Sequence, residues 1–115
     1  MLVNIADIGG LIIKDNETYL LKDNTSLNNL VLSSTELKPQ QKTNGHSHKG
    51  QEEVYFFVTG TGMMYLDEVP RKVGPGDIVL IEDGVHHQVV NDTDESLHFV
   101  CVFDGNRYEK SSTNI

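Results

Sequence analysis

The chain has 115 residues, of which 37% are hydrophobic, and its 9 basic and 17 acidic residues give a formal net charge of −8. We expect one folded domain over residues 1–115, with a flexible tail over about the last ten. The longest apolar runs have five residues, such as Val54–Val58, whereas a membrane-spanning helix needs about 20. The acidic charge repels phosphate backbones and anionic bilayers, so we expect neither nucleic acid nor a membrane as partner.

Cysteine usage and the first residues bear on the cellular compartment. Cys101 is the single cysteine, so no disulfide can form within the chain. Proteins without disulfides are typical of a reducing compartment. The first ten residues carry no basic side chain and include Asp7, so they do not resemble a secretory signal peptide. These features predict a cytoplasmic protein.

Short apolar runs separated by turn residues continue along most of the chain. The separating segments are rich in Gly, Pro, Asn and Asp, which favour turn conformations. No segment keeps a 3.6-residue apolar period long enough to predict a helix. Strands this short at nearly regular spacing predict an all-β sandwich or barrel. Eight segments are predicted strands: Leu11–Ile13, Thr18–Leu21, Leu30–Ser34, Val54–Val58, Met63–Leu66, Asp77–Ile81, Gln88–Val90 and Leu97–Phe103.

Four of the five histidines fall in two short clusters that follow glycines. In the first cluster, His46 and His48 point to the same side if the backbone is extended, because alternate side chains of a strand share a face. In the second cluster, His86 and His87 are adjacent, so their side chains diverge. Only one of these two can therefore join a site formed with the first pair.

A carboxylate follows the first cluster. If the next strand begins at Glu53, its side chain points inward together with those of Tyr55 and Phe57. Glu52 then points to solvent. Three imidazoles and one carboxylate suit a first-row transition metal and leave one or two octahedral positions open for water or substrate. The alternative is that both clusters are solvated turns, but their position beside a carboxylate at strand spacing favours the metal site.

The first cluster resembles the first sequence motif of the cupins, G-x5-H-x-H-x3–4-E-x6-G. His46, His48, Glu53 and Gly60 stand at the two His, the Glu and the second Gly positions. Gln40 replaces the first Gly of the motif. All three ligand positions of this motif are therefore filled.

The second cluster resembles the second cupin motif, G-x5-P-x-G-x2-H-x3-N. Gly76, Gly84, His87 and Asn91 match, and Glu82 stands in place of the Pro. Together the two matches identify the chain as resembling small single-domain cupins over about half its length.

This resemblance implies a fold and a ligand set. The implied fold is a small antiparallel jelly-roll barrel with a metal inside its mouth. The implied ligands of one divalent transition metal (Mn, Fe, Ni or Zn) are His46, His48, Glu53 and His87. The family pattern thus selects His87 over His86.

Further residues are candidates for substrate contacts. Tyr55 would act as an acid, a base or a hydrogen-bond donor, or would only pack in the barrel. The end of the chain resembles the Asp-x-Phe-x3-Arg pattern of cupins that linearise unsaturated uronates: Phe103 and Arg107 match, and Cys101 replaces the acid. Arg107 or Lys49 could balance a substrate carboxylate. Alternation in this last strand predicts Cys101 inside the barrel and His98 outside.

The resemblance implies a metal-dependent enzyme acting on a small polar substrate. The candidate substrates are a sugar, a sugar acid or another organic acid, and the candidate reactions are those of isomerases, lyases and oxygenases. One alternative is a binding or sensing module in which the metal only tethers the ligand. Another is a structural barrel braced by its metal. We also expect a homodimer, in which exposed barrel edges near Leu2–Ile13 pair across the two copies.

Overall fold

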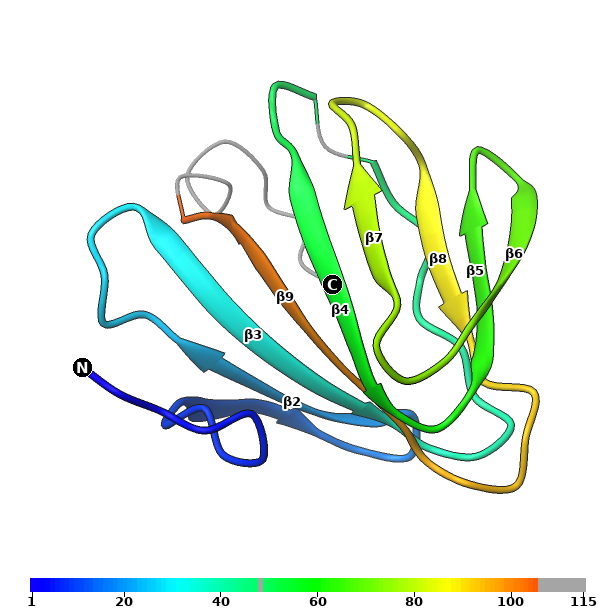
Figure 1. The fold of residues 1–115 in the computed structure, drawn as a ribbon, viewed down its shortest axis with the longest axis horizontal. Helices are drawn as coiled ribbons and strands as arrows, with labels where there is room; N and C mark the ends of the chain where they lie inside the picture. Colours follow the sequence, from blue (N-terminus) through cyan, green and yellow to red (C-terminus); the bar gives the residue numbers. More distant parts are fainter. Residues whose placement is uncertain (48, 106–115) are drawn as a thin grey trace.

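The computed structural model describes residues 1–47 and 49–105, and Figure 1 shows them as a barrel of β-strands. No helix occurs in this part of the chain, and hence none that could cross a membrane. The nine strands are β1 (Leu11–Asp15), β2 (Tyr19–Asn24), β3 (Leu30–Leu37), β4 (Glu53–Thr59), β5 (Gly62–Leu66), β6 (Val69–Val73), β7 (Ile78–Ile81), β8 (His87–Val90) and β9 (Leu97–Asp104).

The strands form two antiparallel sheets. The larger sheet has the order β1-β2-β3-β9-β4-β7, and the smaller has the order β6-β5-β8. Buried side chains of both sheets pack into one core, in which Phe57 and Phe99 of the large sheet join Met64 and Val89 of the small one. The predicted all-β jelly-roll fold is confirmed. This arrangement places the inner faces of β4 and β8 toward the same interior.

All eight predicted strands occur, with ends that differ by up to three residues. Strand β6 was not predicted, and two local features explain the omission. The two-residue turn before it consists of Asp67 and Glu68, whose φ angles of 47° and 67° are positive, whereas such turns usually contain Asn-Gly or Asp-Gly. Pro70 interrupts the strand pattern, but β6 lies at a sheet edge, where a missing N–H donor is tolerated.

Side chains of β4 and β9 alternate as the sequence predicts. In β4, Glu53, Tyr55 and Phe57 are buried, whereas Val54 and Phe56 are exposed. The inward residues of β9 include Cys101, which is buried, as predicted. The interior face of the large sheet therefore carries both the aromatic wall and the carboxylate of the candidate site.

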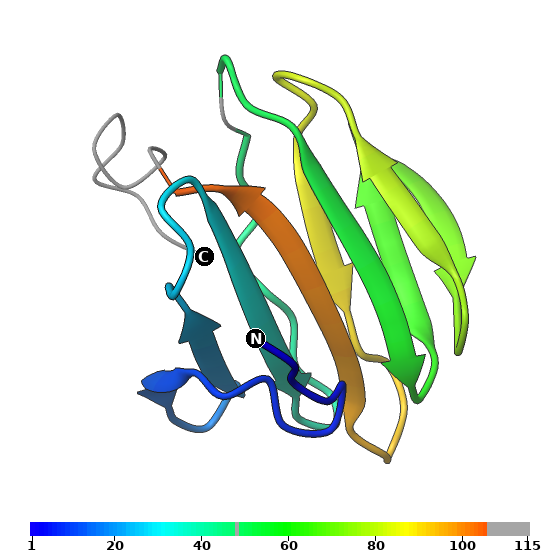
Figure 2. The same cartoon turned by 60° about the vertical axis from the view of Figure 1, so that its left-hand side comes forward.

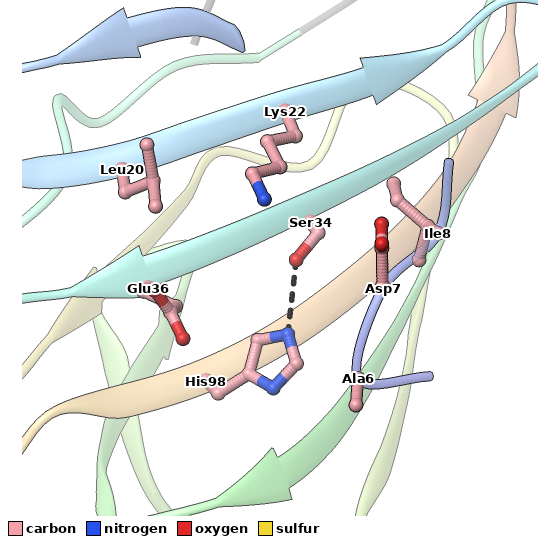
Figure 3. Close-up of a pocket in the computed structure, with 8 residues that line it drawn as sticks. All are labelled: Ala6, Asp7, Ile8, Leu20, Lys22, Ser34, Glu36 and His98. Carbon is pink, nitrogen blue, oxygen red and sulfur yellow. Dashed lines mark hydrogen bonds between the residues drawn. The ribbon is translucent and has the colours of Figure 1, made fainter. Parts of the chain in front are cut away.

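The N-terminal segment crosses the outer face of the large sheet, as Figure 2 shows. Ile8 is buried there, and its carbonyl oxygen accepts a hydrogen bond from the Asn24 side chain at 2.6 Å. Beneath this segment His98 points outward, as predicted, and one of its ring nitrogens lies 2.9 Å from the Ser34 hydroxyl (Figure 3). Burial lowers the pKa of His98, and the nearby carboxylate of Glu36 partly opposes this shift.

Candidate metal centre

Backbone pairing brings one histidine of each cluster together. The N–H of His46 donates to the carbonyl oxygen of His87 at 3.1 Å, and the N–H of His87 donates to that of His46 at 2.9 Å. The two imidazole rings consequently lie with their centroids 4.3 Å apart, at an interplanar angle of 67°. The loop that carries the first motif is thereby attached to the start of β8.

Glu53 completes a buried group of three side chains. It begins β4, and its Oε1 lies 3.7 Å from Nε2 of His87. One potential ligand atom from each of His46, Glu53 and His87 lies within 4.8 Å of the other two. In the described part of the chain, this is the one set of three His, Cys, Asp or Glu residues that meets this criterion. The exposed fractions are 8%, 3% and 2%, so bulk water has little access to these groups.

Both rings are oriented by the same local hydrogen bond. Nδ1 of His46 lies 3.0 Å from the carbonyl oxygen of Asn44, and Nδ1 of His87 lies 3.1 Å from that of Val85. A carbonyl oxygen can only accept, so Nδ1 is the protonated atom and Nε2 presents its lone pair. Two neutral imidazoles and a carboxylate are a donor set that suits Mn, Fe, Ni or Zn. The residues present therefore fit a divalent transition metal.

The structure distinguishes the two histidines of the second cluster. His87 joins Glu53 in the interior, whereas the exposed ring of His86 covers Gly45 so closely that a Cβ atom there would lie 2.4 Å from the ring. The backbone N–H of His86 donates to the Asp67 side chain at 2.9 Å. His48, the remaining predicted ligand, lies outside the described residues.

Tyr55 lies beside the candidate metal ligands. It is buried, its ring is 5.8 Å from that of His87, and it stacks on Phe99 with centroids 5.3 Å apart. Cys101 is its register partner on β9. The structure thus places Tyr55 in the wall of the site, and its catalytic role stays a prediction. Arg107, the other predicted catalytic residue, lies outside the described residues.

Three motif positions have structural rather than ligating roles. At Gly60, φ is +82° and a Cβ would lie 2.4 Å from the carbonyl oxygen of Ser96, so a side chain is excluded. The buried amide nitrogen of Asn91 is within hydrogen-bond distance of the carbonyl oxygens of Leu37 and Lys38 at the end of β3 and of Glu95 in the β8–β9 loop, and so links these two segments. Gln40, which stands where the motif has its first Gly, also has a positive φ of 61°. This conformation explains why the family pattern has Gly there.

Sequence reasoning missed several residues around the site. The carbonyl groups of Asn44 and Val85 orient the histidines, but a backbone acceptor leaves no residue-type signal in a sequence. Gln51 and Asp83 line a pocket that also borders Glu53. Gln51 and Asp83 lie in separate segments, and no local sequence pattern indicates that these segments meet.

Comparison with known proteins places the fold in a family. A family model described as "Cupin domain" matches residues 33–103, which is more than half of the chain. The protein therefore belongs to the cupin family. The matched range includes both motifs and all of the residues that form the candidate metal centre.

Individual relatives are distant. The oxalate-binding protein of Thermotoga maritima is 25% identical over 72 residues, 63% of this chain and 60% of that protein. A protein with a double-stranded β-helix domain from Klebsiella pneumoniae superposes with a TM-score of 0.76 at 17% identity, covering 90% of this chain and 88% of its own. KdgF from Halomonas sp. superposes with a TM-score of 0.73 at 17% identity, covering 87% and 90%. At these identities the structures show the fold alone. The chain spans 48% and 60% of the length of the two curated relatives that it matches.

Proposed function

We propose that this cupin binds one divalent transition metal through His46, His48, Glu53 and His87 and uses it to act on a small polar substrate. The observation that carries the proposal is the convergence of three ligand side chains from separate segments, with their ligand atoms within 4.8 Å of one another. Their burial, and the two Nδ1 hydrogen bonds that direct Nε2 inward, are the features of a prepared metal site.

A metal bound here would act as a Lewis acid toward an oxygen group of the substrate. The protein's own residues supply the rest. The carbonyls of Asn44 and Val85 hold the imidazoles in one tautomer. Tyr55 and Phe99 form a stacked wall that excludes water from one side of the site. Tyr55 is the candidate to donate a hydrogen bond or a proton to the substrate, and Arg107 the candidate to balance a substrate carboxylate.

Elemental analysis of protein purified without a tag or chelator tests this proposal. We expect about one metal ion per chain, because a buried set of this kind has the affinity of a specific site. His87→Gln should lose the metal, and His86→Gln is the matched control that should keep it. Absence of metal after reconstitution, or loss of metal in the control alone, would contradict the proposal.

The second candidate is a non-catalytic binding module, and the name of the relative from Thermotoga maritima favours it. In that case the metal tethers the ligand and no bond changes. Prolonged incubation of metal-loaded protein with candidate sugars and acids distinguishes a binding module from an enzyme. A binder returns the ligand unchanged, whereas an enzyme produces a new species in the NMR spectrum of the mixture.

The predicted homodimer is supported by the edge strand β1. Leu11, Ile12 and Ile13 are 75%, 60% and 49% exposed, although the strand pairs with β2 along one side. An apolar edge strand of this kind is prone to pair with another chain. Cytoplasmic location stays a prediction from the sequence.

A further inference from the structure

The segment that leads to His46 runs antiparallel to β8, and Figure 1 shows it alongside that strand. Lys42 pairs with Val90, and the N–H of Thr43 donates to the carbonyl oxygen of Val89 at 2.9 Å. Because β8 is the last strand of the small sheet, this segment extends that sheet as an irregular additional strand.

The pairing shifts by one residue before it reaches His46. Thr43 is bonded to Val89, whereas His46 is paired with His87. Three steps along this segment therefore match only two steps along β8, so one residue is extra. The extra residue lies within 44–45 and forms a β-bulge, a device that changes the direction of the side chains that follow it.

The bulge decides which way His46 points. In a regular ladder that continued from Thr43, Gly45 would stand opposite His87, and His46 would point to the outside of the barrel. With the extra residue, His46 itself stands opposite His87. It is consequently 8% exposed, and the centroid of its ring lies 4.3 Å from that of His87.

Two side chains satisfy the backbone groups that the bulge separates. In a regular pair, the N–H of Val89 would donate to the backbone carbonyl oxygen of Thr43. Here it donates to the Thr43 hydroxyl, Oγ1, at 3.0 Å. The carbonyl oxygen of Thr43 instead accepts from the side-chain amide of Gln88 at 2.8 Å. Thr43 and Val89 are both buried, so without these side chains the bulge would leave main-chain groups unpaired.

We propose that Thr43 and Gln88 are positioning residues that hold this bulge and thereby keep His46 directed into the candidate metal centre. Neither is a metal ligand, and both act through the register of His46. Without the Thr43 hydroxyl, the N–H of Val89 pairs with the carbonyl oxygen of residue 43, which restores a regular ladder and turns His46 outward. The inference rests on the proposed function, because it concerns the placement of one of the proposed ligands.

Three substitutions of threonine separate this role from a general effect on stability. Thr43→Val removes the hydroxyl at nearly constant volume, and Thr43→Ser is the conservative variant that keeps it. Thr93→Val is the matched control, because its hydroxyl also has two hydrogen bonds: it donates to Oδ1 of Asn91 at 2.8 Å and accepts from the N–H of Glu95 at 3.3 Å. These bonds lie in the β8–β9 loop and not in the bulge.

NMR spectroscopy of the metal-free full chain reports the register directly. In the regular ladder, the N–H of His87 keeps a carbonyl partner in Gly45, whereas the N–H of His46 has none. We therefore expect Thr43→Val to lose hydrogen-exchange protection at His46 but not at His87, and to lose the NOE contacts between the two rings. A general loss of stability would lower both protections together. Gln88→Leu, at a partly exposed position, should give the same pattern.

Metal affinity gives a second measurement, made by chelator competition with Co²⁺, whose absorption spectrum reports its ligands. A fraction of molecules with His46 directed outward lowers the apparent affinity by that fraction. Loss of a residue that orients a metal ligand typically lowers affinity about 10- to 100-fold. We expect a decrease of this size and an altered spectrum in Thr43→Val, with Thr43→Ser and Thr93→Val close to the wild type.

Deletion of Asn44 in the Thr43→Val background tests the register itself. It removes the extra residue, so a regular ladder then places His46 opposite His87, and the ring contact and the protection of His46 should return. The inference would be overturned by unchanged protection of His46 in both Thr43→Val and Gln88→Leu, by an equal loss in Thr93→Val, or by a deletion that restores neither signal. A wild type that binds no Co²⁺ but shows these register changes would refute the proposed function and not this inference.

Discussion

His46 and His87 donate their backbone N–H groups to each other's carbonyl oxygens, and each ring directs its Nδ1 to the carbonyl two residues earlier in the chain. The same local device therefore orients one ligand from each sequence motif. Because two backbone hydrogen bonds connect the two segments, the relative position of the rings depends on main-chain pairing as well as on side-chain packing. Glu53 lies beside the two rings because it occupies an inward-facing position of β4.

Asn91 should be a major source of stability and not a ligand. The two N–H groups of its amide are shared among the carbonyl oxygens of Leu37, Lys38 and Glu95, which lie 2.7–3.1 Å from the nitrogen, and the residue is 1% exposed. Asn91→Ala leaves these buried acceptors without their donor, so we expect a loss of about 2–4 kcal/mol in the free energy of unfolding. Denaturant unfolding measures it, with Asp92→Ala at the exposed neighbouring position as the control. A change below about 0.5 kcal/mol, the range of ordinary surface substitutions, would show that water replaces the amide.

Gln40→Gly should stabilise the protein. Gln40 adopts a φ of 61°, a left-handed conformation that costs a residue with a side chain about 1 kcal/mol relative to Gly. Its side chain donates to Asp94 at 3.1 Å on the surface, and this exposed hydrogen bond contributes little to the free energy of unfolding. We expect a gain of about 0.5–1 kcal/mol after the added flexibility of the unfolded chain is included. The adjacent Gln41→Gly should instead destabilise, and equal effects of the two substitutions would contradict this explanation.

His98 should make folding sensitive to mildly acidic pH. Burial lowers its pKa in the folded state, with Glu36 opposing, so below its ordinary value near 6.5 the unfolded chain binds the proton more readily. Stability attributable to His98 is therefore complete above that pH and is lost as the pH falls. His98→Gln should flatten the decline in unfolding free energy between neutral and acidic pH by less than about 1 kcal/mol. The exposed His86→Gln is the control, and a decline of the same steepness in both variants would refute the assignment.

The predicted homodimer can be tested at the edge strand. Ile12→Lys places a charge on β1 and should convert a dimer to a monomer in sedimentation velocity, because a charged edge resists pairing. Leu80→Lys is the comparison: Leu80 is 70% exposed on β7, at the opposite edge of the same sheet. Dissociation by Leu80→Lys alone would place the interface away from β1, and a monomeric wild type would rule out the dimer.

Much of the site was predictable because local rules decide it. Two-residue alternation put Glu53 on one face with Tyr55 and separated Cys101 from His98, and assigning the bulkier apolar face of the last strand to the interior placed Cys101 inside and His98 outside. Alternation could not choose between His86 and His87. Two adjacent residues of a strand point to opposite faces, and the sequence does not say which of these faces is interior. Motif spacing supplied that choice, and the ring of His86 over Gly45 shows its structural reason.

Other features depended on contacts that no local pattern encodes. Strand β6 forms despite Pro70 because it lies at an edge, and edge position is a property of the whole sheet. One pocket is lined by Gln51, Asp83 and Asp104, which come from three separate segments. Eight of the nine strands, the alternation of their side chains and the groups able to bind a metal were predictable from the amino-acid sequence alone, because these follow from backbone geometry and side-chain chemistry over a few residues. Only the tertiary structure decided which of those groups meet, because antiparallel pairing between strands distant in the chain sets their register and hence the distances between their side chains.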